Sequence, residues 1–185
     1  MSFEVRETLK ALKAGEDPVR LSGTFSEIAK AVFNGNDTKG EQRRIFPADQ
    51  AYTQLINDIG FTYQQLWEHL LELKPRPTDP NFTQNLGTMF EGARAWLESA
   101  RSRDPQRAVV YLNLSDLWRV CDKQPDPKLK EEPEALLRAQ CYASKYTELM
   151  SKTKLLSKKI PPELTKFLGD KSGIASQPEC KKFFL

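Results

Sequence analysis

The sequence has few of the residues that carry enzyme chemistry. Its 185 residues include one histidine, His69, and three cysteines that lie far apart and form no CxxC pair. A metal site of the His/Cys type is therefore poorly supported, because zinc needs several such ligands. His69 lies beside Glu68 and Glu72, but no motif places a serine or cysteine nucleophile near it. We interpret His69 as a helix-surface or interface residue rather than a general base.

Local motifs for catalysis and cofactor binding are also missing. The segment GTMFEG at 87–92 lacks the GK[ST] ending and the preceding strand of a phosphate-binding loop. No GxSxG, DxDxDG or HExxH pattern occurs. We therefore predict that the protein is not an enzyme and uses no cofactor and no metal.

The cysteine pattern and the length of the apolar runs indicate whether the protein is intracellular, secreted or membrane-spanning. An odd number of scattered cysteines does not suggest a disulfide framework, so we expect Cys121, Cys141 and Cys180 to be reduced thiols. The start, MSFEVRETLK, has early acidic residues and no apolar stretch, which predicts no signal peptide. No run approaches the roughly 18 apolar residues of a membrane span. These features predict an intracellular protein of the cytoplasm or an organelle matrix, not a secreted one.

The composition is that of an ordinary globular chain. Hydrophobic residues make up 39% and charged residues 29%, which argues against wholesale disorder. A chain of 185 residues has room for one domain with a substantial core. We expect a single helical domain over 1–168, followed by an extended C-terminal tail over 169–185.

The clearest helical pattern lies at 82–100. Its apolar residues fall at offsets 0, 4, 7, 8, 11, 14, 15 and 18 and are Phe82, Leu86, Met89, Phe90, Ala93, Trp96, Leu97 and Ala100. This is a wide apolar stripe with helical period, typical of a core helix. Gly87 and Gly92 lie off the stripe, and each costs about 1 kcal/mol relative to Ala in a helix. Each marks either a close helix contact or a tolerated residue.

Other helices are predicted from periodicity and end signals. Capping boxes begin at Thr24 and Thr62, and glycine or proline follows each apolar stretch. The polar segment 34–46 is predicted to be an exposed loop, and the proline-rich segment 75–80 a stiff linker. The predicted helices of this half are 3–14, ended by Gly15; 24–33, ended by Asn34-Gly35; 47–59, begun by Pro47 and ended by Gly60; and 62–74.

The C-terminal half continues the pattern. Asp104 and Pro105 are predicted to begin a helix as its cap and first residue. The segment 108–114 is rich in β-formers and can also be a buried strand. The helical spacing of its apolar residues with Leu117 and Cys121 favours a helix. A further helix is predicted from Pro133 to about Ser157. The sequence thus predicts an all-α fold, a multi-helix bundle or irregular array of about seven helices.

The basic charge is concentrated near the C-terminus. The net charge is +3, whereas residues 152–185 alone carry eight Lys and three acidic residues. Such a tail can bind RNA, an anionic membrane or an acidic protein face, or it can simply be solvated. The final Phe183, Phe184 and Leu185 suggest docking into a groove of this protein or of a partner, unless the end is frayed.

Basic residues of the first loop add to the candidate contacts. Arginine in a loop can clamp phosphates or carboxylates. The complete set of candidate partner or phosphate contacts is Arg43, Arg44, Lys152, Lys154, Lys158, Lys159, Lys166, Phe183, Phe184 and Leu185.

Two functional hypotheses follow. The first is a non-enzymatic helical structural or interaction subunit of a larger macromolecular assembly, which binds other subunits or itself through loops and the basic tail. The alternative is an RNA-binding nucleocapsid or coat-like protein that polymerises along nucleic acid through phosphate contacts. Few aromatic residues lie among the tail lysines, so base stacking is not indicated. Peripheral membrane binding through 151–168 ranks last, because Pro161-Pro162 shortens any amphipathic helix there.

Overall fold

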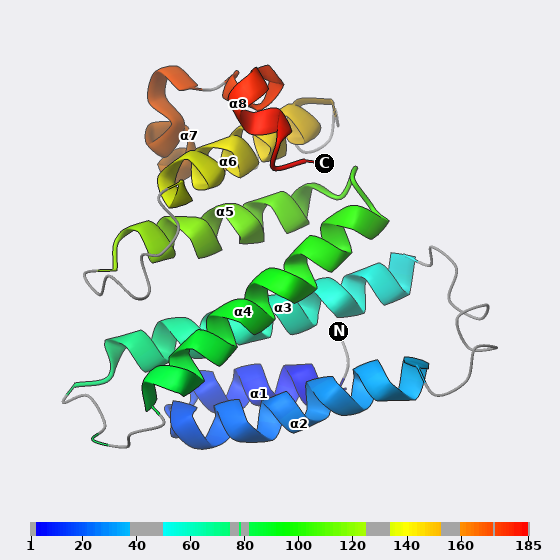
Figure 1. Ribbon diagram of the computed structural model, residues 1–185, viewed down its shortest axis with the longest axis vertical. Coiled ribbons are helices and arrows are strands. Elements are labelled where there is room, and N and C mark those ends of the chain that lie inside the picture. The colour runs from blue at the N-terminus through cyan, green and yellow to red at the C-terminus, as the bar shows by residue number, and fades with distance from the viewer. Residues whose placement is uncertain are drawn as a thin grey trace. The chain divides into compact units, whose positions relative to one another are not determined.

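A computed structural model describes most of the chain as helix (Figure 1). The described residues are 3–37, 50–74, 78, 82–124, 134–152, 160–171 and 173–184. Their regular elements are eight α-helices and two 3-10 turns, without a strand, which confirms the all-α prediction. No helix in this part of the chain is long and apolar enough to cross a membrane.

The chain divides into two compact units, Met1–Asp104 and Pro105–Leu185. The prediction of a single domain over 1–168 stays a prediction. The first unit contains four helices: α1 (Phe3–Lys13), α2 (Pro18–Asp37), α3 (Gln50–Glu72) and α4 (Phe82–Arg103).

Within the first unit, α1 and α2 form an antiparallel pair that packs on α3 (Figure 1). Gly15, with a φ of 82°, closes the turn between them, as its position in the sequence predicts. The helices α3 and α4 run antiparallel and share the most extensive contact of this unit. Ring contacts fix both interfaces, with centroids 5.1 Å apart for Phe25–Tyr63 and 5.2 Å apart for Trp67–Phe90.

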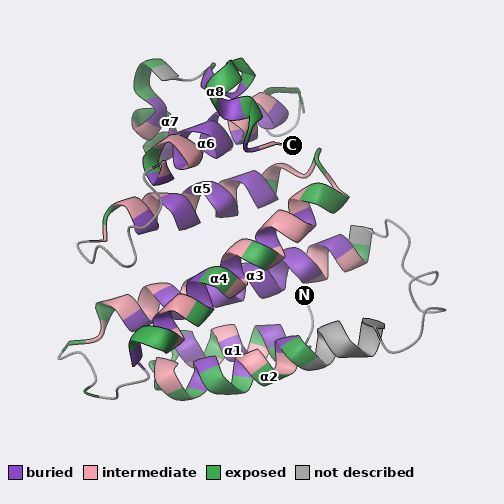
Figure 2. Ribbon diagram, viewed as in Figure 1, coloured by how far each residue is buried: buried purple, intermediate pink, exposed green. Residues whose placement is uncertain are grey.

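The predicted core helix is α4. Seven of its eight stripe residues are buried, and only Trp96 is half-buried (Figure 2). Gly92 is a close helix contact, because a Cβ there would lie 2.9 Å from a ring carbon of Tyr63 on α3. A Cβ on Gly87 would meet nothing within 4 Å, so this glycine is only tolerated.

The prediction that Gly60 ends a helix is wrong. Helix α3 runs through Gly60 without a break, which joins the two predicted helices 47–59 and 62–74. A Cβ on Gly60 would lie 2.8 Å from Cγ of Leu97, so this glycine serves the α3–α4 contact. Thr62 is no cap either, since its hydroxyl donates to the Asp58 carbonyl one turn earlier. The predicted start at Pro47 lies outside the described residues.

The predicted bounds of the second helix are also wrong. Helix α2 begins at Pro18, where the Asp17 carboxylate accepts a hydrogen bond from the Val19 amide. The Thr24 hydroxyl donates to the Arg20 carbonyl inside the helix and caps nothing. The helix then continues through Asn34-Gly35 to Asp37. The rest of the predicted loop, 38–46, lies outside the described residues.

The second unit is built on the antiparallel pair α5 (Ala108–Asp122) and α6 (Ala135–Lys152) (Figure 1). Helix α5 confirms the choice of helix over strand at 108–114, but it begins after Arg107 and not at Pro105. Ser115 donates to the Ala139 carbonyl at 2.9 Å, so small residues bring the two backbones close. The predicted helix start at Pro133 and the predicted continuation of α6 over 153–157 lie outside the described residues.

The predicted extended tail over 169–185 is wrong. The described residues of this region, 169–171 and 173–184, form η3 (Gly169–Lys171), η4 (Ile174–Ser176) and α8 (Pro178–Lys181), which follow α7 (Pro162–Leu168). Both η4 and α8 contact α6, and the Ala175 amide donates to the Ser144 hydroxyl. Ile174, Cys180 and Phe183 are buried, so the segment carries enough apolar side chains to fold back onto its unit.

A disulfide joins Cys141 of α6 to Cys180 of α8, with their Cα atoms 5.5 Å apart. The expectation of reduced thiols is therefore wrong for these two cysteines. Cys121 is free and buried. The pairing was not visible in the sequence because the two cysteines are 39 residues apart and only the folded segment brings them together. The predicted intracellular location stays a prediction.

Candidate functional site

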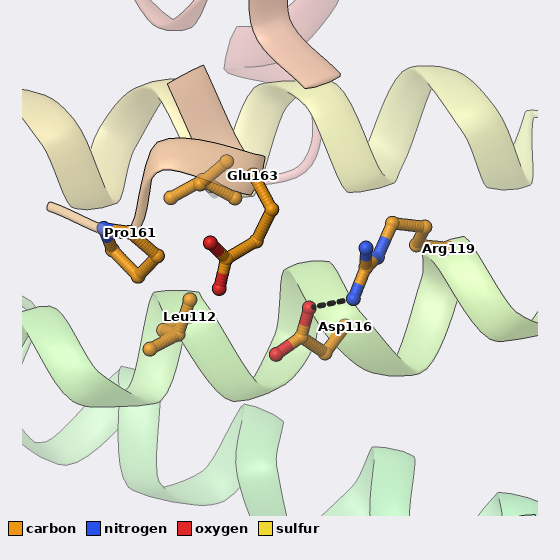
Figure 3. Close-up of a pocket in the computed structure, with 6 residues that line it drawn as sticks. Leu112, Asp116, Arg119, Pro161 and Glu163 are labelled. Carbon is orange, nitrogen blue, oxygen red and sulfur yellow. Dashed lines mark hydrogen bonds and ion pairs between the residues drawn. The ribbon is translucent and has the colours of Figure 1, made fainter. Parts of the chain in front are cut away.

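A small cleft lies between α5 and the start of α7 in the second unit (Figure 3). Its volume is about 150 Å³. Three residues spaced along α5 form one side. The residue before α7 and two residues of its first turn form the other. The lining residues are Leu112, Asp116, Arg119, Pro161, Glu163 and Leu164.

The cleft contains two carboxylates and one guanidinium. Arg119 donates to the Asp116 carboxylate at 2.8 Å, and both side chains are about a third exposed, at 32% and 33%. Glu163 is exposed and forms no hydrogen bond or ion pair with the described residues. Its carboxylate extends toward α5, on the side where Leu112 and Asp116 lie (Figure 3). The charged groups of the described residues that line the cleft therefore sum to one negative charge.

The electrostatics of Asp116 reflect this surrounding. Partial burial, which disfavours the charged form, raises the pKa of Asp116. The neighbouring Arg119 opposes this shift, and the nearby charge of Glu163 adds to it. The Asp116 carboxylate is thus not fully compensated by Arg119, and a further positive charge in the cleft would stabilise it.

The size and the walls limit what the cleft can hold. Pockets for metabolites and cofactors usually measure about 300–1,000 Å³, well above the volume found here. Leu164 is buried, while Leu112 and Pro161 are half-buried and present apolar surface to the cleft. The cleft therefore combines a small volume with apolar walls and three charged side chains.

Most of the predicted contact residues lie outside the described part of the chain. Arg43, Arg44, Lys154, Lys158, Lys159 and Leu185 lie outside the described residues. Lys152 lies at the end of α6 and pairs with Glu148 at 2.6 Å. Lys145 also binds Glu148, so this carboxylate already offsets part of the local positive charge. Lys166 is exposed on α7.

The two described aromatic residues of the C-terminus dock onto their own unit. Phe183 is buried, and its carbonyl accepts a hydrogen bond from the Tyr142 hydroxyl at 3.3 Å. The Arg138 guanidinium lies 4.9 Å from the centre of the Phe183 ring. Phe184 meets Tyr111 and Tyr142 edge-on, with centroids 6.1 and 5.8 Å away. Of the alternatives for this end, the structure shows Phe183 and Phe184 docked on the helices of their own unit.

His69 has a structural contact within its own helix. Its Nδ1 lies 2.8 Å from the Gln65 carbonyl oxygen, one turn earlier in α3. The neighbouring Glu68 accepts hydrogen bonds from Gln64 and Gln65. The part of the chain that the structure describes contains no group of three or more His, Cys, Asp or Glu that can hold a metal ion.

The cleft residues were missed at the level of sequence. Asp116 and Arg119 lie off the apolar stripe of α5 and look like ordinary surface charges. Glu163 reaches them from another helix, and no local pattern indicates which charges two separate helices bring together. The sequence feature that could have indicated the cleft was the mixture of charged and apolar residues around Pro161-Pro162.

Comparisons with known proteins give no relative. No family model, no curated protein and no solved structure matches this chain.

Proposed function

We propose that the chain is a non-enzymatic helical structural subunit that assembles with other protein chains, copies of itself included. The observation that carries this proposal is the cleft between α5 and α7, which has the size of one side chain. Protein interfaces are commonly anchored by single side chains inserted into small pockets. A cleft on two helices offers such a pocket on a rigid support.

The division into two units fits the same function. Each unit has its own buried core, around Trp67 and Leu97 in the first and around Trp118 and Tyr142 in the second. Each unit has helical surface of its own, and a subunit that contacts more than one neighbour needs more than one such surface.

An RNA-binding coat-like protein is the second candidate. The exposed Lys166 on α7 favours it, because an unshielded lysine can contact phosphate. The ion pair between Lys152 and Glu148 weakens it, since this lysine would have to leave a carboxylate to bind RNA.

Light scattering after size-exclusion chromatography tests the proposal. The full chain is purified at low salt and measured over a wide concentration range, with absorbance at 260 and 280 nm. We expect a protein-only species whose mass exceeds the 21.2 kDa of one chain and rises with concentration. A monomer at every concentration would overturn assembly of the chain with copies of itself. A multimer that carries nucleic acid and loses it in high salt would support the RNA-binding candidate instead.

A further inference from the structure

We infer that the cleft between α5 and α7 binds the lysine side chain of a partner protein. The ammonium would lie between the carboxylates of Asp116 and Glu163, and the methylene groups along Leu112, Pro161 and Leu164. This inference rests on the proposed function, because it names the partner group that the same cleft accepts.

Charge complementarity carries the first step. Arg119 neutralises only one of the two carboxylates, since it is held on Asp116. Glu163 extends toward α5 and has no ion pair with the described residues (Figure 3). A cation entering the cleft meets a net negative charge from its described lining residues, whereas an anion would be repelled by both carboxylates.

The shape of the cleft carries the second step. Lysine has a long apolar stem and a compact charged end, so it can place its methylene groups on apolar surface while the ammonium stays polar. The cleft offers this sequence of surfaces, with apolar side chains beside two carboxylates in about 150 Å³. Arginine fits less well, because its planar fork of five donors needs several acceptors, and Arg119 already uses Asp116.

The affinity of a single side chain is expected to be weak. A partly exposed ion pair strengthens binding only about two- to fivefold, so one lysine adds specificity to an interface rather than holding it alone. The binding of a short lysine peptide is therefore measured with a method that detects weak binding and locates it on the chain.

The test is an NMR titration of the full, isotope-labelled chain with three capped tripeptides, Ala-Lys-Ala, Ala-norleucine-Ala and Ala-Glu-Ala. We expect the lysine peptide to shift the amide signals of Leu112, Asp116 and Glu163. The norleucine peptide, which keeps the stem without the charge, is expected to bind more weakly, and the glutamate peptide not at all. Equal binding of the lysine and norleucine peptides, or shifts confined to other parts of the chain, would overturn the inference.

Matched variants locate the effect. Glu163→Gln keeps the shape of the side chain and removes one charge, so it should weaken lysine-peptide binding roughly two- to fivefold. Glu179→Gln changes an exposed acid on α8 outside the cleft and should leave the binding unchanged. Unchanged binding to Glu163→Gln would contradict the assignment.

The two proposals can fail separately. If the chain self-associates but binds no lysine peptide at the cleft, only the lysine inference falls. If the chain stays monomeric yet binds the lysine peptide at the cleft, the self-assembling subunit falls and the lysine site stands.

Discussion

Two glycines set the distance between α3 and α4. A Cβ on Gly60 would lie 2.8 Å from Cγ and 3.0 Å from the backbone nitrogen of Leu97. A Cβ on Gly92 would lie 2.9 Å from the ring of Tyr63, so the two helices approach closely at two points. Gly87 lies on the same helix as Gly92 but faces open space. Glycine therefore has different roles at these three positions. Gly60 and Gly92 allow the close contact between α3 and α4, whereas Gly87 does not take part in it.

Replacing Gly60 by alanine should destabilise the first unit. The added methyl group would overlap Leu97, including its backbone nitrogen, and overpacking of this kind costs about 1–3 kcal/mol. The free energy of unfolding, measured by chemical denaturation, should fall accordingly. The control Gly87→Ala should raise it by about 0.5–1 kcal/mol, because alanine is the better helix former and has room there. Equal effects of the two substitutions would show that close packing does not decide the role of Gly60.

The side chain of Asp116 should contribute more to the stability of the second unit in acid, where it is protonated, than at neutral pH, where it is ionised. Burial raises the pKa of Asp116, so the folded protein holds this proton more tightly than the unfolded chain does. The ionised carboxylate thus lowers stability as the pH rises through the raised pKa. Asp116→Asn removes the charge and should raise the melting temperature at neutral pH but not in acid. A lower melting temperature at neutral pH would show that the ion pair with Arg119 dominates.

Glu148 should show the opposite dependence. Hydrogen bonds from Lys152 and Lys145 hold the pKa of Glu148 below its ordinary range, so its contribution is present at neutral pH. That contribution is lost as the pH falls through the lowered pKa. Glu148→Gln should therefore lower the melting temperature slightly at neutral pH and leave it unchanged in strong acid. The effect is small because all three side chains are partly exposed.

At the scale of single elements, the sequence predicts the helices whose apolar residues recur with a clear helical period. Helix α4 was located from its apolar stripe, and α5 was correctly distinguished from a strand. The prediction at Gly60 failed because a local stop signal matters less than the packing of the whole helix. In α3 the packing of Leu97 against Gly60 makes the glycine part of a long helix.

The C-terminal segment was missed for a different reason. Its buried residues Ile174, Cys180 and Phe183 are too sparse to show a helical period, and they are stabilised by partners on α6. The cleft was missed in the same way, since Glu163 and Asp116 come together only in three dimensions. Local periodicity predicts elements, whereas contacts between distant short segments depend on the folded chain.

The disulfide should account for much of the stability of the C-terminal segment. Closing a loop between cysteines 39 residues apart restricts the unfolded chain, which corresponds to about 4 kcal/mol in the chain-entropy description. Cys180→Ser should lower the free energy of unfolding of the second unit by up to this amount. A reductant should lower the stability of the natural chain similarly and leave the variant unchanged. A natural chain that is insensitive to reductant would show that the segment is held by its noncovalent contacts alone.

At the scale of the whole molecule, the two units provide separate cores on one chain. The first unit buries Trp67 of α3 against Phe90 of α4, and the second buries Trp118 of α5 beneath Arg138 of α6. The only described disulfide lies entirely within the second unit, and the close glycine contacts lie entirely within the first. A perturbation of either feature therefore acts directly on one unit alone.

Hydrogen exchange followed by mass spectrometry should separate the two units energetically. A reductant is expected to speed amide exchange in α5–α8 and leave α1–α4 unchanged, because exchange from a core reports the free energy of opening that unit. Gly60→Ala should do the reverse and speed exchange in α1–α4 only. Faster exchange throughout the chain after either change would mean that the units open together. In that case the chain would unfold as one cooperative structure despite its two cores.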